Sequence, residues 1–410
     1  MFDEYKGLPI QAKYLVYSMI LPSLALGMFY TDISYFLTTV QGVSYALMGV
    51  VISVMGVSTF VASIPLGIAA DRYGKRKLLI IGNVIASAIV AIFALTTNPA
   101  ILLVAAIFEG VSEGAFAASS SALIAEKAGD ERRTSVFSLF GFAQGIAFGI
   151  GSFIIPVVVV FQIVGFSTRE SHVVLYVILA SLSLASTLIM LKITESNVKR
   201  ETRAFNIIRT LANMKSKDVL IKFVVASAII AFGAGIIVPL MTAWMKAQYG
   251  ISDSLSGPIL GVANIVIGVA TLAAPALSRK LGLVKAIVVT QAISTGFMFA
   301  TPLCPDYVSA SIVYTSRAFL MNMSSPLQQS MIMGLVAEDE RGVASGISAA
   351  LWRLPNALSS FIGAWLIGAG LLAEPFFLAG LFYAVSIALF WIYFRETKMP
   401  EESSTETIKD

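Results

Sequence analysis

The sequence predicts an all-α membrane protein in which twelve transmembrane helices form two pseudo-symmetric six-helix bundles. Its composition, its apolar runs and an internal repeat predict this fold. The 410 residues are 57% hydrophobic and 13% charged, with a mean hydropathy of +0.85. Soluble domains carry about 25% charged residues, so this chain has too little charge to cover a water-facing surface. This composition disfavours a soluble enzyme, a nucleic-acid-binding protein and a disordered protein.

The apolar runs have the length that a membrane span requires, which is about 20 residues. The N-terminal segment lacks the cleavage pattern of a signal peptide, so we expect the first run to be a retained helix. The predicted spans of the first half lie near 14–38, 44–69, 78–97, 100–124, 136–160 and 173–191. Those of the second half lie near 223–244, 256–277, 286–303, 307–336, 343–368 and 375–394.

The basic residues predict the orientation of the chain. Of the 28 Lys and Arg residues, all but Arg169, Lys246, Arg317 and Arg353 fall in the two tails or in one set of alternate loops. Loops rich in Lys and Arg stay in the cytoplasm. We therefore expect a multi-pass protein of the cytoplasmic membrane with both termini in the cytoplasm.

The two halves of the chain repeat each other. Gly42, Ser44, Gly49 and Gly74 recur 208 positions later, as Gly250, Ser252, Gly257 and Gly282. The repeat predicts an N-terminal bundle at 1–192 and a C-terminal bundle at 219–410. Basic residues and helically spaced apolar residues predict a cytoplasmic linker with an interfacial helix at 193–218.

The sequence contains little that could support catalysis or a cofactor. Cys304 is the single cysteine and His172 the single histidine, and no metal-ligand spacing is present. We expect no metal, no cofactor and no enzymatic activity. His172 begins the sixth predicted span on the outer side, where we expect it to be solvated. No G-x-x-x-x-G-K-S/T motif is present, so an ion gradient is the expected energy source.

A motif follows the second predicted span, with the sequence Gly67-Ile-Ala-Ala-Asp71-Arg72-Tyr-Gly74-Lys75-Arg76-Lys77. It resembles the signature loop of the major facilitator superfamily, G-x-x-x-D-R-x-G-R-K, which lies between helices 2 and 3 on the cytoplasmic side. Gly67 would allow close helix approach and Gly74 a tight turn. The resemblance implies a transporter fold in which this loop latches the two halves together in the outward-open state. The latch residues it implies are Gly67, Asp71, Arg72, Gly74, Lys75 and Arg76. The matching segment of the second half has Arg279 in place of the acid.

Five ionisable residues lie inside predicted spans: Asp32, Glu109, Glu113, Arg317 and Arg353. Such groups are costly in a membrane and mark functional sites or ion pairs. At about 1.5 Å per residue, Asp32, Glu109 and Arg317 lie at a similar depth. They predict either a functional cluster or a structural salt bridge between the halves.

Glu109 and Glu113 are four residues apart and share one helix face. Two carboxylates so close in a low dielectric should not both be ionised. We therefore expect a proton carrier here. Glu113 is the first candidate because its repeat counterpart is neutral. Asp32 is the second candidate and Glu109 the third.

The resemblance implies that helices 1, 4, 7 and 10 line a central cavity, so other polar residues on the predicted spans are candidate substrate ligands. We expect Arg317, Asn322, Tyr30, Arg353 and Gln328 to line the central cavity. Arg353 could instead pair with an acid or hold a carbonyl at the kink expected from Pro355. Pro239 and Pro326 are expected to kink their helices.

The sequence predicts a secondary transporter that moves a small organic solute by alternating access, coupled to protons. The acids favour efflux of a drug or metabolite by proton antiport. Two departures weaken that interpretation, because Ile150 follows Gly149 where antiporters have Gly-Pro and Ala106 stands where many have Arg. Uptake of an organic anion by proton symport is the alternative, and a non-transporting receptor is a third. The expected partners are a small molecule, protons and the bilayer, with no nucleic acid, and the expected state is a monomer.

Overall fold

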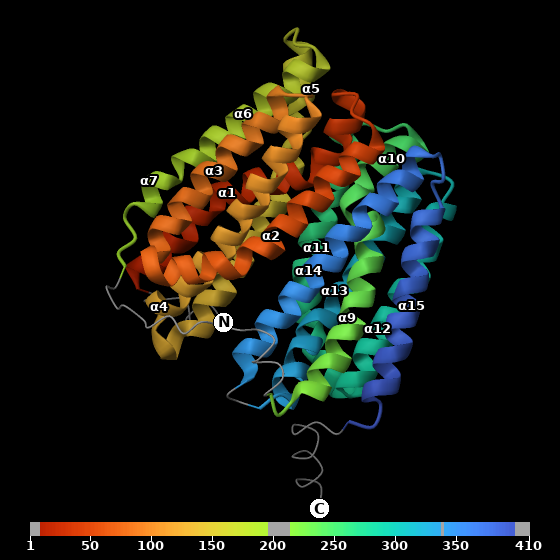
Figure 1. Cartoon of the computed structure of the whole chain (residues 1–410). Helices are drawn as coiled ribbons and strands as arrows, with labels where there is room; N and C mark the ends of the chain where they lie inside the picture. The colour runs from red at the N-terminus through yellow and green to blue at the C-terminus, as the bar shows by residue number, and fades with distance from the viewer. Residues whose placement is uncertain (1–8, 196–213, 338–339, 398–410) are drawn as a thin grey trace, which may run out of the picture. The chain divides into compact units, whose positions relative to one another are not determined.

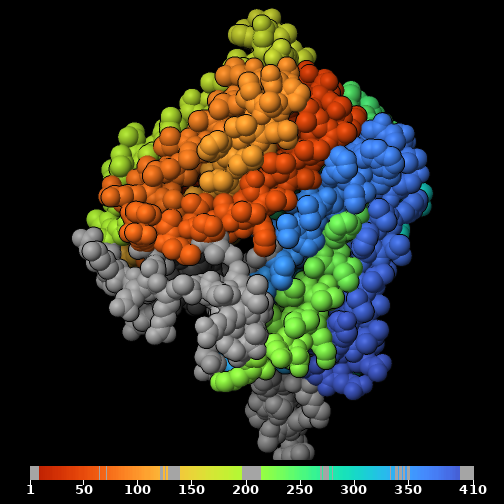
Figure 2. Space-filling model, in the orientation of Figure 1, coloured from red at the N-terminus to blue at the C-terminus, as the bar shows by residue number. Residues whose placement is uncertain are grey.

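The structure is a computed structural model of the whole chain, and it describes residues 9–195, 214–337 and 340–397. Figures 1 and 2 draw the remaining residues in grey. The described residues are almost entirely helical and contain no strand. Most of the linker predicted at 193–218, with its interfacial helix, lies outside the described residues.

The described residues of the first half form seven α-helices, which Figure 1 labels. They are α1 (Ile10–Tyr35), α2 (Tyr45–Tyr73), α3 (Lys75–Leu95), α4 (Pro99–Ile154), α5 (Val157–Ile163), α6 (Thr168–Ala185) and α7 (Thr187–Met190). A π-helical turn, Phe36–Val40, extends α1. Asn98 caps the start of α4, because its side-chain oxygen accepts hydrogen bonds from the backbone of Ala100 and Ile101.

The second half builds α9 (Lys217–Ile237), α10 (Met241–Tyr249), α11 (Asp253–Leu281), α12 (Leu283–Ala300), α13 (Tyr307–Leu335), α14 (Arg341–Gly368) and α15 (Glu374–Phe394). A 3₁₀ turn, Val238–Leu240, separates α9 from α10 and contains Pro239. The predicted kink at Pro239 is therefore confirmed as a break in the α-helix. Pro326 and Pro355 lie inside α13 and α14.

The loop predicted between the fourth and fifth spans is wrong, because α4 continues as helical backbone through 126–134. A straight helix of 56 residues would be about 84 Å long. The helix must fold back, since Glu109 and Phe148, 39 positions apart in sequence, both contact Tyr30 of α1. The two predicted spans are therefore the two arms of one bent helix.

Nine segments of the described residues are long and apolar enough to cross a membrane. They include both arms of α4, and α9 with α10 counts as one. The helices that match the eighth, tenth and eleventh predicted spans, α11, α13 and α14, are not among the nine. All twelve predicted ranges coincide with helix, and the count of twelve spans stays a prediction.

Exposed apolar side chains form helical stripes, which is the pattern of a lipid-facing surface. On α15, the exposed residues Phe377, Leu381, Val385 and Ile392 follow this spacing. Figure 2 shows the packed outer surfaces of α2 and α3 in orange and of α15 in blue. Together with the nine segments, these stripes indicate a multi-pass membrane protein.

The chain forms two compact units. The first contains residues 1–203 and 239–265, and the second contains 204–238 and 266–410. This division differs from the halves predicted from the repeat, because α10 and the start of α11 pack with the first unit.

The repeat is visible in the packing of each unit. A Cβ on Gly27 would lie 2.0 Å from the carbonyl oxygen of Phe148, and a Cβ on Gly235 would lie 1.9 Å from that of Asn356. Both members of the second contact stand 208 positions after those of the first. Both glycines therefore allow two helix backbones to touch, at equivalent places. The paired turn glycines also agree, since Gly42 and Gly250 both have φ of 71°.

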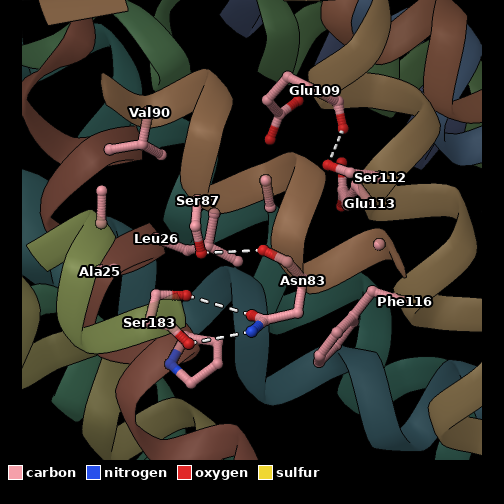
Figure 3. Close-up of a pocket in the computed structure, with 14 residues that line it drawn as sticks. Ala25, Leu26, Asn83, Ser87, Val90, Glu109, Ser112, Glu113, Phe116 and Ser183 are labelled. Atoms are coloured by element: carbon pink, nitrogen blue, oxygen red, sulfur yellow. Dashed lines mark hydrogen bonds between the residues drawn. The ribbon is translucent and has the colours of Figure 1, made fainter. Parts of the chain in front are cut away.

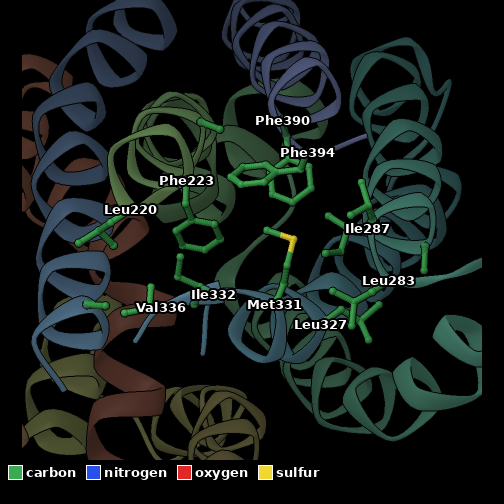
Figure 4. Close-up of a cluster of buried hydrophobic side chains, with 14 of the residues drawn as sticks. Leu220, Phe223, Leu283, Ile287, Leu327, Met331, Ile332, Val336, Phe390 and Phe394 are labelled. Carbon is green, nitrogen blue, oxygen red and sulfur yellow. The ribbon is translucent and has the colours of Figure 1, made fainter. Parts of the chain in front are cut away.

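Each unit has an apolar core near the end where its first helix begins. Figure 4 shows the core of the second unit, where Leu220 and Phe223 of α9 meet Ile287 of α12, Met331 of α13 and Phe394 of α15. The corresponding core of the first unit includes Leu15, Leu79, Leu123, Phe140 and Met190. The polar groups described next lie away from these cores.

Candidate functional site

Two carboxyl groups on α4 meet one tyrosine of α1. The hydroxyl of Tyr30 donates to Glu109 Oε1 and lies 3.3 Å from Glu113 Oε2. Thr59 of α2 contributes its hydroxyl, 3.0 Å from the same Glu113 oxygen. The prediction that the two glutamates share a helix face is confirmed.

Small residues bring these helices close enough for the contacts to form. A Cβ on Gly110 would lie 2.2 Å from the carbonyl oxygen of Met55, so α2 and α4 touch through their backbones. On the other side of α4, a Cβ on Gly82 of α3 would lie 3.2 Å from the Cβ of Ala115. The close approach at Gly110 allows Thr59 to lie beside Glu113.

The hydrogen-bond partners of Glu113 suit a group that gains and loses a proton. Thr59 has one hydroxyl proton and two acceptors within 3.0 Å, the carbonyl of Met55 and Glu113 Oε2. A protonated Glu113 can donate to the threonine oxygen while the threonine donates to the carbonyl. An ionised Glu113 can instead accept from the threonine. Both protonation states therefore find a hydrogen bond.

A cavity of about 30 Å³ lies beside the two glutamates, inside the first unit (Figure 3). That volume suffices for a water molecule. Asn83 supplies much of the polar lining from α3, and its amide donates to the carbonyl of Ser183 at 2.9 Å. Its side-chain oxygen accepts from the hydroxyl of Ser183 at 3.2 Å, and its backbone carbonyl accepts from Ser87 at 2.8 Å. The cavity can hold water against the carboxyl groups, and it is too small for an organic solute.

Asp32 lies elsewhere in the same unit and has different partners. It is two residues from Tyr30, about 200° around α1, so it faces α6 rather than α4. Its Oδ2 accepts from the hydroxyl of Tyr176 at 3.0 Å. His172 of α6 and Asp253 of α11 complete a buried cluster with it. The expectation that His172 is solvated is wrong, because it is 1% exposed and its Nε2 lies 2.8 Å from Asp253 Oδ2.

In the second unit, Arg317 of α13 is enclosed by tyrosines. Its guanidinium donates to the hydroxyl of Tyr383 at 2.6 Å and lies 5.5 Å and 5.6 Å from the ring centroids of Tyr314 and Tyr383. The residue is 4% exposed. Within its own unit the arginine is therefore held by a hydrogen bond and cation–π contacts. The predicted cluster of Asp32, Glu109 and Arg317 spans the two units and stays a prediction.

The family model described as Major Facilitator Superfamily matches residues 14–359 and, in a second match, 223–409. The chain belongs to the major facilitator superfamily. The resemblance predicted from the signature loop is confirmed, and so is the all-α membrane fold.

Two curated proteins of bacteria resemble this superfamily member. Inner membrane transport protein YajR of Escherichia coli (strain K12) is 31% identical over 118 residues, which are 29% of this chain and 26% of that protein. Multidrug resistance protein 2 of Bacillus subtilis (strain 168) is 21% identical over 366 residues, which are 86% of this chain and 88% of that protein.

Solved structures share the fold. A mutant of the nucleoside transporter NupG aligns with a TM-score of 0.77 and 14% identity, covering 94% of this chain and 100% of that one. A bacterial homologue of the human lysosomal transporter Spinster aligns with a TM-score of 0.75 and 12% identity, covering 93% and 96%. These neighbours show the fold, and the family indicates a transporter.

The signature loop of this superfamily member is a one-residue turn. Gly74 ends α2 and precedes α3 with φ of 108°, a conformation that favours glycine. Glu195 accepts from the backbone N–H groups of Lys75 and Arg76 at 2.6 Å and 3.3 Å, and thereby satisfies the start of α3. The ammonium of Lys75 pairs with Glu126 at 2.9 Å.

The other signature residues lie earlier, on the last turns of α2. Gly67 is half-buried and Arg72 is exposed, and Asp71 lies in the same helix. The guanidinium of Arg72 lies over the ring of Tyr73, 5.4 Å from its centroid. The part that these residues play in a latch stays a prediction.

The remaining predicted cavity residues lie on helices of the second unit. Asn322 of α13 donates to the carbonyl of Ala318 at 2.8 Å, one turn earlier in its own helix. Gln328 on α13 and Arg353 on α14 are half-buried. Their role in binding a substrate stays a prediction.

Sequence reasoning missed Thr59, Asn83 and Asp253. Thr59 and Asn83 are neutral residues in apolar runs, so nothing in the sequence separates them from packing residues. Asp253 falls just before the eighth predicted span, where an outer-loop residue is expected. The available signal was that the single histidine and this acid both stand at outer span ends.

The buried cluster also offers one ligand atom each from Asp32, His172 and Asp253, all within 4.8 Å of one another. Such a set could hold a metal ion, which nothing in the sequence predicts. The 2.8 Å separation of His172 and Asp253 is, however, a hydrogen-bond distance.

Proposed function

We propose that this superfamily member is a proton-coupled secondary transporter, which moves a small organic solute across the cytoplasmic membrane by alternating access. The observation that carries the proposal is the pair of glutamates that share Tyr30 beside a cavity large enough for water. A carboxyl inside a membrane protein with hydrogen bonds for both protonation states and a nearby water site has what a proton carrier needs.

Glu113 is the proposed carrier because Thr59 serves both of its protonation states. Glu109 and Asp32 are the further proposed coupling residues. Arg317, Asn322, Tyr30, Arg353 and Gln328 are the proposed substrate-contacting residues. The signature loop is the proposed conformational latch, through Gly67, Asp71, Arg72, Gly74, Lys75 and Arg76.

We propose efflux of a drug-like compound or metabolite by proton antiport as the direction of transport. The acids of the first unit support a cationic or neutral substrate that exchanges with protons. The likeness to a protein named for multidrug resistance, over most of both chains, supports the same direction. The proposed topology places both termini in the cytoplasm, because the basic loops favour that side. The proposed working state is a monomer.

Symport of an organic anion is the second candidate function, and a specific observation favours it. Arg317 is a permanent cation inside the second unit, and Arg353 is half-buried on α14 of the same unit. A guanidinium is a strong ligand for carboxylate and phosphate groups. A substrate with such a group would enter together with protons.

The test uses the protein reconstituted in liposomes with a trapped pH dye and candidate solutes added outside. Antiport predicts that an external substrate makes the lumen alkaline, and symport predicts that it makes the lumen acidic. Glu113→Gln should lower the pH signal at least tenfold, because an amide cannot carry a proton. The matched control is Glu374→Gln, an exposed acid at the start of α15, which should leave the signal unchanged.

Two outcomes contradict the proposal. Labelled solute that enters without any pH change indicates a uniporter or another coupling ion. Solute binding without entry into the lumen indicates a non-transporting receptor.

A further inference from the structure

A helical hairpin from the second repeat closes on the first unit. The hairpin is α10 with the start of α11, residues 241–265, and it belongs to the first unit by its contacts. The hydroxyl of Thr242 lies 2.6 Å from that of Ser34 and donates to the carbonyl of Thr31 at 2.9 Å. A Cβ on Gly257 would lie 3.0 Å from the carbonyl oxygen of Ser152, so the hairpin packs backbone to backbone.

The hairpin carries Asp253 and buries it against Asp32 of α1 and His172 of α6. Asp32, His172 and Asp253 are 0%, 1% and 2% exposed. The stretch from Gln162 to Glu170, just before His172, is exposed or half-buried and begins α6 at the end of the bundle away from the start of α1. Movement of the hairpin away from α1 and α6 would therefore open the cluster to water at that end.

The hydrogen bonds of His172 require a proton between it and Asp253. Its Nδ1 lies 2.7 Å from the carbonyl oxygen of Thr168, which can only accept, so Nδ1 carries a proton. Its Nε2 lies 2.8 Å from Asp253 Oδ2. A bare nitrogen and a bare carboxylate would repel at this distance. One proton therefore sits between them, on the imidazolium or on the carboxyl.

Asp32 can bind a second proton in the cluster. With one proton shared by His172 and Asp253, an ionised Asp32 leaves a net charge of −1 among three buried groups. Tyr176 donates to Asp32 Oδ2, and Asp32 Oδ1 is buried without a hydrogen-bond partner among the described residues. Protonation at this oxygen would neutralise the cluster, which burial favours.

Among the residues that the structure describes, no lysine or arginine pairs with the cluster to balance that charge. From α1, Tyr35 stacks on the His172 ring at 6.5 Å, and from α6 comes the Tyr176 hydroxyl. The cation of α10, Lys246, donates to the carbonyl of Gly250. A proton is therefore the available counter-charge.

We propose that Asp32, His172 and Asp253 form a proton-binding lock that holds the hairpin closed on α1 and α6. Closure binds a second proton as an O–H bond on Asp32. Opening breaks that bond and releases the proton to water at the end of the bundle away from the start of α1. Above about pH 6.5, where a solvated imidazole is neutral, opening also releases the proton that His172 and Asp253 share. The lock rests on the proposed function, since it supplies a proton-dependent step of alternating access.

A metal ion fits this cluster less well than a proton. A tetrahedral zinc bound to a histidine nitrogen and a carboxylate oxygen would hold them about 3.4 Å apart. The observed 2.8 Å is the length of a direct hydrogen bond. The experiment nevertheless includes zinc, because the three ligand atoms lie within 4.8 Å of one another.

The experiment follows closure of the hairpin against pH in the full chain. Spin labels are attached at Ala247→Cys on α10 and Arg169→Cys on α6, both exposed, in a Cys304→Ser background. Distances between the labels are measured in detergent from roughly pH 5 to pH 9, a range that spans histidine titration. Closure binds the Asp32 proton and, above about pH 6.5, also the proton shared by His172 and Asp253. The ratio of closed to open should therefore rise up to tenfold for each unit that the pH falls at acid pH, and up to about a hundredfold at alkaline pH.

Variants of the cluster separate the lock from a mere packing contact. Asp32→Asn should lower the slope of the pH dependence by one proton, and His172→Gln should change the slope above about pH 6.5, where the histidine proton is exchanged. Tyr176→Phe should keep the fold and move closure to higher pH, because the ionised Asp32 loses a donor. Asp306→Asn is the matched control, since it changes an exposed acid that caps α13 and asparagine caps equally well.

Three results would overturn the lock. They are a pH dependence that Asp32→Asn leaves unchanged, a single label distance at every pH, and calorimetric binding of zinc that His172→Gln abolishes. If the lock fails while the liposomes still show coupled pH changes, the proposed function stands. If closure titrates as expected but no solute changes the lumenal pH, the lock stands and the proposed coupling is wrong.

Discussion

Glu109 in the first unit and Arg317 in the second stand 208 positions apart, at equivalent places of the repeat. Their charges are opposite, and their surroundings also differ. Glu109 shares Tyr30 with a second acid and lines a cavity. Arg317 is sealed between the rings of Tyr314 and Tyr383. The first interior is suited to groups that exchange protons, and the second to a fixed charge.

Tyrosines at nearly corresponding places of the repeat bind an acid in the first unit and the arginine in the second. Tyr176 of α6 donates to Asp32, whereas Tyr383 of α15, 207 positions later, accepts from Arg317. A phenol can do either, because its hydroxyl both donates and accepts. A carboxyl can change its protonation near neutral pH when it is buried, whereas a guanidinium does not. The two halves of the repeat therefore share their packing and differ in their chemistry.

The largest expected effect concerns the close glycine contact that occurs inside each unit. Gly27→Ala and Gly235→Ala should each destabilise the protein by about 3 kcal/mol, because the added Cβ would overlap a backbone carbonyl that cannot yield. Thermal unfolding in detergent measures this loss. Gly145→Ala is the control, since nothing lies within 4 Å of its Cβ and alanine favours the helix. A large loss of stability in only one of these two variants would show that the two glycine contacts are not equivalent.

The next effect tests the chemistry in which the units differ. Tyr383→Phe should cost about 1.5 to 3 kcal/mol of stability, since Arg317 loses a charge-assisted hydrogen bond. It should leave the pH profile of transport unchanged, because the lost contact joins a phenol to a guanidinium and involves none of the proposed proton-carrying acids.

Tyr30→Phe is the counterpart in the first unit. It removes a donor that Glu109 and Glu113 share, so transport should shift its pH profile. Initial rates of solute flux between about pH 5 and pH 9 measure both variants. A pH shift in Tyr383→Phe and none in Tyr30→Phe would reverse the comparison.

The smallest effect concerns equivalent helix caps outside the spans. Asp306 caps α13 and Asn98, 208 positions earlier, caps α4. Hydrogen bonds from the backbone and side chain of Ser309 lower the pKa of Asp306 below its usual 3.8. The cap therefore contributes stability above the usual value and loses it as the pH falls through the lower one.

Hydrogen exchange at the start of each helix, corrected for the intrinsic effect of pH, measures this difference. The start of α13 should become less protected at acid pH, and the start of α4 should not. Asp306→Asn should remove the dependence on pH, and Asn98→Asp should introduce it at α4. Equal behaviour of the two native caps would show that the charge has no part in capping.

Much of the fold followed from local sequence. Apolar runs near 20 residues predicted helices that the structure contains, because backbone groups in lipid must be satisfied within a helix. The turn at Gly74 followed from its place in the signature motif, and the pairing of Glu109 with Glu113 from helical periodicity. The prediction of a loop at 126–134 was wrong because charged residues can end a membrane span without ending a helix.

The membrane class, the superfamily, the repeat and the charged residues inside the spans can all be read from the sequence, because composition, periodicity and motif spacing are local properties. The partners of those charges become apparent only in the folded chain. Thr59, Asn83 and Asp253 join their sites through contacts between helices that are far apart in sequence. The backbone contacts of Gly27, Gly110 and Gly257 bring those helices together, and close packing of this kind depends on which faces meet, a property that no single segment contains.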